Sequence, residues 1–383
     1  MKFFHLSDLH IGLKLINRDL REDQEYILNE IVRLAGENKP DAIVISGDIY
    51  DKAVPSAEAV EVFDQFIASL TETVPDSVVM MISGNHDSAP RVNCFRQILS
   101  RQKVHMVGQP PRLENEYIEK VTLKDDYGNV NFYLLPFVKP SMVKYVTGVD
   151  ENGNNLSYNE ALYRLIEREN IDKTERNILV SHQLYLPNGT KADDIERMDS
   201  ETRTVGNIDE VKSDILKNFD YAALGHIHKP MKVGNEVYRY CGTPLACSVS
   251  EAGQQKGIVM VDFGAKGDAP EIKVLPLKPL RQIKIIKGTL NEVCGQACDD
   301  YVSVTLTDKI DLDVVDMQEK IRRAFPNLLE IRRESYKNVE YKKSLQEKEL
   351  IDPYELICSF LSNPDDEDKE ILKDVLNTVL GVK

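Results

Sequence analysis

Short polar motifs that follow directly after short apolar runs are the feature that most constrains the fold of this chain. Five such motifs occur between residues 7 and 228, and each contains Asp, Asn or His. They are Ser7-Asp8-Leu9-His10, Gly47-Asp48-Ile49-Tyr50-Asp51, Gly84-Asn85-His86-Asp87, Ser181-His182 and Gly225-His226-Ile227-His228. A short run rich in Val, Ile, Phe and Met that ends at a polar loop is typical of a buried strand. The pattern therefore predicts strands whose carboxyl ends carry the chemically competent side chains.

Buried strands alternate with amphipathic helices in the first part of the chain. We predict strands over Lys2–Leu6, Asp41–Ser46 and Ser77–Ser83 from their length and apolar content. A helix is predicted over Asp19–Gly36, and a second helix begins after Ser56, whose hydroxyl suits an N-cap. Repeated strand, loop and helix favour an α/β sheet whose chemistry collects at the carboxyl ends of the strands.

The rest of the chain predicts a second sheet layer and a small additional domain. Further strands are expected over 130–136, 177–182, 221–224, 236–241 and 257–263, with a helix over 157–169. The Pro-rich stretch Leu275–Leu280 is typical of a domain boundary. Beyond it, strands over 281–286, 301–306 and 328–333 and a helix over 312–325 suffice for a small α+β domain. From Glu349 onward we expect two short amphipathic helices separated by Asn363-Pro364.

The charge of the chain excludes binding of nucleic acid by overall basicity, because the net charge is -15. Residues 276–348 carry 14 Lys and Arg against 12 Asp and Glu (+2), residues 349–383 carry 3 against 9 (-6), and residues 1–275 account for the remaining -11. If the chain handles DNA or RNA, positive charge must come from bound divalent cations or from a partner protein.

Hydropathy predicts a cytoplasmic protein without a membrane span. No apolar run approaches the roughly 18 residues that cross a bilayer. The amino-terminal residues turn polar at Ser7 and Asp8, too early for the apolar core of a signal peptide. At 383 residues, the chain is also longer than one hydrophobic core usually serves, so more than one domain is expected.

Two of the motifs carry paired polar side chains two residues apart. In extended backbone, Asp8 with His10 and His226 with His228 project to the same side of a strand. Carboxylates, imidazoles and an amide without a thiolate suit Mn²⁺, Fe²⁺ or Zn²⁺, and manganese is our first choice. Two such ions about 3.5 to 4 Å apart can clamp a phosphate and activate a water molecule.

The concentration of histidine in these motifs indicates a single site. One Asp-x-His or Asn-His dipeptide alone is usually a turn or a solvated surface group. The chain has 7 histidines, and only His5 and His105 lie outside the motifs. Random placement would seldom produce this distribution, so we expect the motifs to converge.

The order D-x-H, G-D-x-x-D, G-N-H-D, a later His and G-H-x-H resembles the calcineurin-like metallophosphoesterase superfamily. The segments 4–12, 225–230 and 240–244 resemble more particularly the nuclease subunits of bacterial SbcCD-type DNA repair complexes. The resemblance implies an α/β fold with a two-layered β-sheet sandwich flanked by helices. It also implies a nuclease domain over 1–275, a capping domain over 276–340 that positions DNA, and a linker with C-terminal helices over 341–383 that bind an ATPase.

The resemblance also implies roles for single residues, and the chain matches the superfamily pattern at each position. The implied metal ligands are Asp8, His10 and His228 for one ion, Asn85, His182 and His226 for the other, and Asp48 as the bridge. His86 is expected over the phosphate as transition-state stabiliser and candidate proton donor, with Asp51 orienting its ring.

The resemblance further implies partners and an activity. Subunits of this kind form homodimers and join an SbcC-like SMC-type ATPase in a heterotetramer. The implied activity is ATP-dependent exonuclease cleavage of double-stranded DNA and endonuclease cleavage of single strands or hairpins, in repair and recombination. The extra domain and tail distinguish this interpretation from a metallophosphatase acting on a small molecule or phosphoprotein, which the metal motifs alone do not. A non-cutting scaffold of the ATPase is a third interpretation, against which the intact His86 argues.

Overall fold

The computed structural model describes residues 1–190, 198–201, 209–308, 314–334 and 369. Its described residues up to Glu334 belong to one compact unit. None of the helices in these ranges is both long and apolar enough to traverse a bilayer. Apart from Lys369, the predicted C-terminal helices after Glu349 lie outside the described residues.

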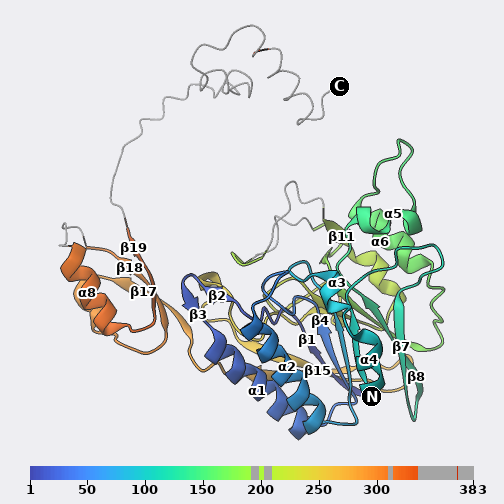
Figure 1. Ribbon diagram of the computed structural model, residues 1–383, viewed down its shortest axis with the longest axis horizontal. Coiled ribbons are helices and arrows are strands. Elements are labelled where there is room, and N and C mark those ends of the chain that lie inside the picture. The colour runs from blue at the N-terminus through green and yellow to red at the C-terminus, as the bar shows by residue number, and fades with distance from the viewer. Residues whose placement is uncertain (191–197, 202–208, 309–313, 335–368, 370–383) are drawn as a thin grey trace. The chain divides into compact units, whose positions relative to one another are not determined.

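Two six-stranded sheets form the centre of this unit (Figure 1). In spatial order, the first sheet contains β16 (Glu271–Leu277), β15 (Lys256–Asp262), β1 (Lys2–Leu6), β4 (Ala42–Ser46), β5 (Val78–Ile82) and β6 (Val104–Val107). The second contains β13 (Met231–Lys232), β14 (Tyr238–Tyr240), β12 (Tyr221–Gly225), β9 (Arg176–His182), β8 (Gly128–Leu135) and β7 (Glu119–Asp125). Strands β1, β4, β5 and β6 are parallel, as are β8, β9, β12 and β14, so their carboxyl ends share an edge within each sheet.

Successive side chains of a strand point to opposite faces of its sheet, into two different apolar clusters. Phe3 of β1 points between the two sheets and packs edge-on against Phe132 of β8 and Tyr221 of β12, with ring centroids 5.6 and 5.5 Å apart. Phe4, the next residue, joins the cluster that contains Ile27 of helix α1 (Arg21–Asn38) and residues of α2 (Ala57–Thr73). This alternation is the period of two expected for a strand buried on both faces.

Helices cover the outer face of each sheet. Helices α1 and α2 pack on the first sheet, and α5 (Pro140–Thr147) and α6 (Tyr158–Glu167) pack on the second (Figure 1). Ser56 caps α2 by accepting a hydrogen bond from the Ala59 amide, as the sequence predicts. The resulting order of helix, sheet, sheet and helix confirms the predicted fold class, a two-layered β-sheet sandwich flanked by helices.

Strand β16 extends into the Pro-rich stretch Leu275–Leu280, because it runs through Pro276 to Leu277. Pro276 pairs with Gly257 of β15 in the register of an edge strand. An edge strand tolerates proline, since one side of its backbone needs no partner in the sheet. The chain therefore leaves the sheet only after Leu277, and the predicted division at residue 275 remains a prediction.

The small α+β element after this point has its own apolar cluster. It contains β17 (Ile283–Gly288), α7 (Leu290–Cys294), β18 (Tyr301–Leu306), α8 (Val314–Ala324) and β19 (Leu328–Arg333), and its three strands are parallel. Ile286, Val304 and Phe325 are buried in its core. The Tyr301 hydroxyl and the Arg281 guanidinium both bind the Asp23 carboxylate of α1, at 2.7 and 2.8 Å.

Candidate metal centre

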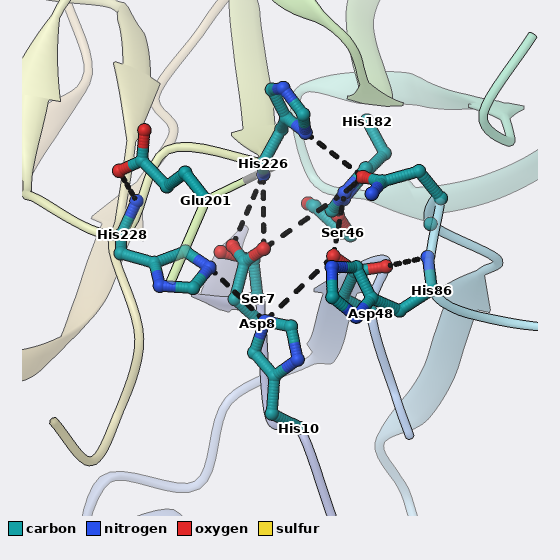
Figure 2. Close-up of polar contacts among 12 residues, drawn as sticks. Ser7, Asp8, His10, Ser46, Asp48, His86, His182, Glu201, His226 and His228 are labelled. Carbon is teal, nitrogen blue, oxygen red and sulfur yellow. Dashed lines mark hydrogen bonds and ion pairs between the residues drawn. The ribbon is translucent and has the colours of Figure 1, made fainter. Parts of the chain in front are cut away.

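The side chains predicted to bind metal converge at the carboxyl ends of five strands (Figure 2). Asp8 and His10 follow β1, Asp48 follows β4, Asn85 and His86 follow β5, His182 ends β9, and His226 and His228 follow β12. The strands of each sheet are parallel here, and the two sheets face one another. His10 and His228, which are 218 positions apart in the sequence, therefore meet in one site.

Asp8, His10 and His228 form the first group. Each offers a ligand atom, and the three atoms lie within 4.8 Å of one another. Nε2 of His10 is 3.1 Å from Nε2 of His228. All three side chains are buried. This is the set that the resemblance assigns to one ion.

Asn85, His182 and His226 form the second group. Oδ1 of Asn85 lies 3.1 Å from Nε2 of His182 and 2.9 Å from Nδ1 of His226. The Asn85 oxygen therefore lies close to one nitrogen of each imidazole, so three donor atoms are near one another. The structure thus brings together all three residues expected at the other ion.

Asp48 lies between the two groups. Its Oδ2 atom is 3.2 Å from Nε2 of His182 and 3.8 Å from Nε2 of His10, and its Oδ1 accepts the amide hydrogen of His86 at 2.8 Å. Asp48 also groups with Asp8 and His182, with ligand atoms within 4.8 Å. This placement suits the bridging role predicted for it.

His86 is oriented through the main chain of Asp51. Nδ1 of His86 lies 2.9 Å from the Asp51 carbonyl oxygen, which can only accept, so Nδ1 carries the hydrogen. The Asp51 carboxylate instead lies 3.9 Å from Nδ1 of His10. The sequence thus identifies the orienting residue, but the contact is made by its main chain.

The backbone of four of the predicted ligands is strained. Asp8, His10, Asp48 and His226 have φ values of 54°, 44°, 48° and 103°. Residues with a Cβ atom rarely adopt positive φ, and such conformations concentrate at functional sites. The tight turns direct side chains from the strand ends inward.

The glycines of the motifs are required by close approach to the ligands. A Cβ atom on Gly47 would lie 2.3 Å from Nδ1 of His182, and one on Gly84 would lie 2.1 Å from Oδ1 of Asp48. At Gly225 it would lie 2.0 Å from the Ser46 carbonyl oxygen. These distances are too short for any contact, so each Gly in G-D, G-N-H-D and G-H-x-H leaves room for the site.

Burial and opposite charge shift the titration of these groups. Burial lowers the pKa of His10 to about 3. Burial opposes ionisation of Asp48, but the neighbouring imidazoles, chiefly His182, hold the pKa of its carboxyl well below the usual range. For His182, burial is outweighed by the charge of Asp48, and its pKa rises to about 9. The site therefore has a strong electrostatic preference for positive charge beside Asp48.

The donor set fits divalent metal ions. Nδ1 of His10 is buried and has no hydrogen-bond partner among the described residues, with the Asp51 carboxylate 3.9 Å away, so the polar capacity of this ring is not satisfied by hydrogen bonds there. Cys247 lies near His228, but burial raises the pKa of its thiol well above the usual value, which disfavours a thiolate ligand. Carboxylate, amide and imidazole donors remain, the combination expected for Mn²⁺, Fe²⁺ or Zn²⁺.

Glu251 is a site residue that sequence reasoning missed. Its buried carboxylate lies 3.4 Å from Nδ1 of His228, accepts a hydrogen bond from Ser200 at 2.9 Å, and pairs with Lys256 at 2.6 Å. Burial opposes its ionisation, but the bond to His228 and the charge of Lys256 lower the pKa of Glu251 to about 2. A lone Glu with no strand-end motif gives no sequence signal, because its role depends on the tertiary path of the chain.

Asp87, the last residue of the G-N-H-D motif, ties two loops together. Its carboxylate accepts amide hydrogens from Gly84, Ile49 and Tyr50 at 2.9, 3.0 and 2.9 Å. Burial, with the nearby charge of Asp48, raises its pKa to about 6. The sequence shows Asp87 as part of the G-N-H-D motif, but the motif alone did not predict a role for it.

A sandwich fold with oxygen and imidazole donors at its strand ends defines a metal-dependent phosphoester hydrolase. Residues 1–230 match the model of the family described as calcineurin-like phosphoesterase. The chain belongs to this family, whose members use divalent metal ions. Residues 276–364 match a second model, SbcD_C, described as the type 5 capsule protein repressor C-terminal domain.

Three solved structures are similar to parts of this chain. The protein TT1561 of Thermus thermophilus has 13% identity and a TM-score of 0.42, covering 72% of this chain and 99% of its own. A dimetal phosphatase from Danio rerio has 12% identity and a TM-score of 0.39, covering 73% and 98%. GAP50, the anchor in the inner membrane complex of Plasmodium, has 13% identity and a TM-score of 0.39, covering 88% and 98%.

Proposed function

We propose that this chain is an SbcD-type nuclease subunit that hydrolyses DNA phosphodiesters with two divalent metal ions, preferably Mn²⁺. The observation that carries the proposal is the convergence of the donors on both sides of Asp48. The match of residues 276–364 to the SbcD_C model supports the nuclease assignment over a compact phosphatase.

In the proposed hydrolysis, some residues bind the metal ions and His86 acts on the phosphate. Asp8, His10 and His228 would hold one ion, Asn85, His182 and His226 the other, and Asp48 both. When bound, the ions supply Lewis-acid chemistry that offsets the phosphate charge and makes water more acidic. Water adds across one P–O bond, so one oxygen binds phosphorus and the leaving oxygen takes a proton. His86, held by the Asp51 carbonyl, is positioned to stabilise the phosphoryl oxygens and to donate that proton from its protonated ring.

The partners follow from the same assignment. The proposed assembly is a homodimer of this chain joined to an SbcC-like SMC-type ATPase, with residues 349–383 as the docking segment. The segment carries -6, so contact with a protein is electrostatically easier for it than contact with DNA. Exonuclease cleavage of duplex ends would then depend on ATP and the ATPase, whereas cleavage of single strands and hairpins would depend less on this partner.

The test compares substrates on the purified chain. We expect cleavage of a labelled single-stranded oligodeoxynucleotide with Mn²⁺, loss of cleavage with EDTA, and cleavage of linear duplex ends only with the ATPase and ATP. His86→Ala is the matched control for contaminating nucleases. A chain that hydrolyses p-nitrophenyl phosphate readily and leaves every DNA substrate intact is a phosphatase, and the proposal is then wrong.

A further inference from the structure

A hairpin tip and a strand of the small α+β element line the cavity above the metal centre. The cavity has a volume of about 380 Å³, and His10, His86 and His228 line it on the metal side. Ile16 and Arg332 line it as well, the first from the loop after β2 (Lys14–Leu15) and the second from β19. Neither residue belongs to a metal-binding motif, so metal binding does not explain its position in the cavity.

Ile16 has a conformation that its residue type disfavours. Its φ value is 58°, and 46% of its side chain is exposed. The position lies between β2 and β3 (Arg18–Asp19), a two-residue connection in which Gly, Asn or Asp is the usual solution. A β-branched residue in the left-handed region is an outlier, and such strain is typical of ligand-contacting positions. An exposed apolar side chain in the cavity of the candidate metal centre suits contact with an apolar group of the substrate.

Arg332 brings positive charge to the same cavity. Among the described residues that line it, Arg332 is the one Arg or Lys. Its guanidinium pairs with Glu330 of the same strand at 2.9 Å, and 64% of the side chain is exposed. An exposed ion pair of this kind is weak and can exchange its carboxylate for a phosphate.

The hairpin and β19 are held together. Nη2 of Arg18 donates to the Pro326 carbonyl at 2.8 Å, and its Nε donates to the Leu328 carbonyl at 3.4 Å. Leu328 is the first residue of β19 and Pro326 precedes the strand, four and six residues before Arg332. These hydrogen bonds therefore hold the hairpin that carries Ile16 beside the strand that carries Arg332.

We propose that Ile16 and Arg332 form a subsite for the nucleotide next to the scissile phosphate, with its base on Ile16 and its phosphate on Arg332. The inference rests on the proposed function and specifies its substrate: a DNA strand rather than a phosphomonoester. A base offers the flat apolar face that Ile16 can contact, and guanidinium binds phosphate in a forked geometry. A small phosphate ester would engage the metal side of the cavity alone.

The test separates the strand from the phosphoester. Ile16→Asn keeps a residue that tolerates positive φ and removes the apolar contact, and Arg332→Ala removes the cation. Ile285→Asn and Arg323→Ala are matched controls, because Ile285 is 57% exposed and Arg323 forms an exposed ion pair with Glu319 in the same part of the chain. The substrates are a single-stranded oligodeoxynucleotide and methyl p-nitrophenyl phosphate, a diester without a nucleotide.

We expect kcat/KM on the oligodeoxynucleotide to fall about tenfold or more for Ile16→Asn and Arg332→Ala, largely through KM. Hydrolysis of the small diester and metal content should stay within about twofold, and both controls should behave as the unmodified chain. If the variants cut the oligodeoxynucleotide normally, or lose both substrates equally, the subsite is refuted while the nuclease assignment stands. If the unmodified chain hydrolyses only the small diester, the proposed function fails and the subsite with it.

Discussion

At the scale of single residues, Asp48 connects several parts of the site. It touches Nε2 of His10, the amide of His86 and Nε2 of His182, which come from three different strand ends. The motifs made this convergence predictable, because parallel strands bring their carboxyl ends to one edge. The supporting contacts of Glu251 were not predictable, since they depend on a loop with no periodic pattern.

Replacement of Asp48 and of His86 should separate metal binding from catalysis. Asp48→Ala should weaken both ions, because its carboxylate faces both groups of donors. His86→Ala should leave about two ions per chain and lower the rate roughly 10²-fold or more, the scale of a lost acid or charge-stabilising group. Elemental analysis of both variants, alongside a nuclease assay, measures this. Loss of metal from His86→Ala would contradict the assigned roles.

Glu251→Gln should affect one ion more than the other. Glu251 lies beside Nδ1 of His228, so the change should misalign this proposed ligand and lower the metal affinity at its site by about 10- to 100-fold. Titration of the metal-free protein with Mn²⁺ should resolve one weakened and one unchanged affinity. Glu37→Gln, on the exposed surface of α1, serves as control. Equal weakening of both ions, or a large fall in thermal midpoint, would indicate a general role in folding instead.

At the scale of elements, strand bounds could be predicted where burial is nearly complete. The predicted bounds Lys2–Leu6 and Tyr301–Leu306 are those of β1 and β18. The sequence does not predict strand β7, because Glu119–Asp125 is an edge strand whose charged side chains alternate with few apolar ones. The end of strand β16 resembles a linker in the sequence, because proline disfavours most strand positions and is tolerated at an edge.

The two sheets are joined at the end opposite to the metal centre by Asp125 and Arg176. The buried guanidinium of Arg176 binds the Asp125 carboxylate of β7 and donates to the carbonyls of Gly128 and Gly264, each at 2.8 Å. Arg176 holds the pKa of Asp125 well below its usual range, with help from the N-terminal amine of Met1. The contacts join β7, β8 and β9 to the ends of the first sheet.

Asp125→Asn should destabilise the fold in a pH-dependent manner. At pH 7 we expect a loss of about 3 kcal/mol, because Arg176 is left buried without its carboxylate. A lowered pKa in the folded state means that the stabilisation is complete above the unfolded pKa of about 4 and fades as pH falls further. Urea unfolding should therefore show a difference between the two proteins that shrinks in acid. Asp214→Asn, which breaks an exposed pair with Lys217, should change little, and a pH-independent difference would contradict the prediction.

At the scale of the whole molecule, the order of parts could be predicted but their contacts could not. The motifs, the small α+β element and the uneven charge are all features of the sequence. Ile16 and Arg332 line one cavity because the small α+β element contacts two earlier parts of the chain. Arg18 of the β2–β3 hairpin donates to the Pro326 carbonyl, and Asp23 of α1 binds Arg281. Such contacts join residues about 300 positions apart and leave no local pattern.

The proposed homodimer should depend on an exposed apolar surface at α4 (Arg96–Leu99). Phe95 and Ile98 lie three residues apart and are 74% and 63% exposed, and neighbouring exposed apolar side chains are suited to a protein interface. Phe95→Glu with Ile98→Glu should convert a dimer to a monomer in analytical ultracentrifugation, because two added charges per copy would meet across the interface. Tyr145→Glu, at an equally exposed position in α5, should leave the dimer intact. A monomeric unmodified chain, or an unaffected double variant, would contradict this placement.

Removal of residues 349–383 should uncouple the nuclease from its proposed ATPase partner. The segment lies almost entirely outside the part of the chain that the structure describes. Its sequence has apolar residues at helical spacing: Tyr354, Ile357, Cys358, Phe360, Leu361, Ile371, Leu372, Val375, Leu376, Val379 and Leu380. An amphipathic helix needs a surface for its apolar face, and a groove on a partner provides one. The buried clusters of the described residues all lie before Ser335, so the shortened chain should fold and retain its metals.

The shortened chain should still cut single-stranded DNA with Mn²⁺, because the metal centre is formed by residues between Asp8 and His228. It should lose pull-down of the ATPase and ATP-dependent cutting of duplex ends, because both need the proposed docking helices. A matched control keeps the segment and replaces Asp365 and Asp366, which lie between the two apolar stretches, by Asn. That variant should bind the ATPase normally if the apolar faces carry the contact. Normal binding by the shortened chain would place the partner's surface elsewhere, and unfolding would show that the segment packs on its own small domain.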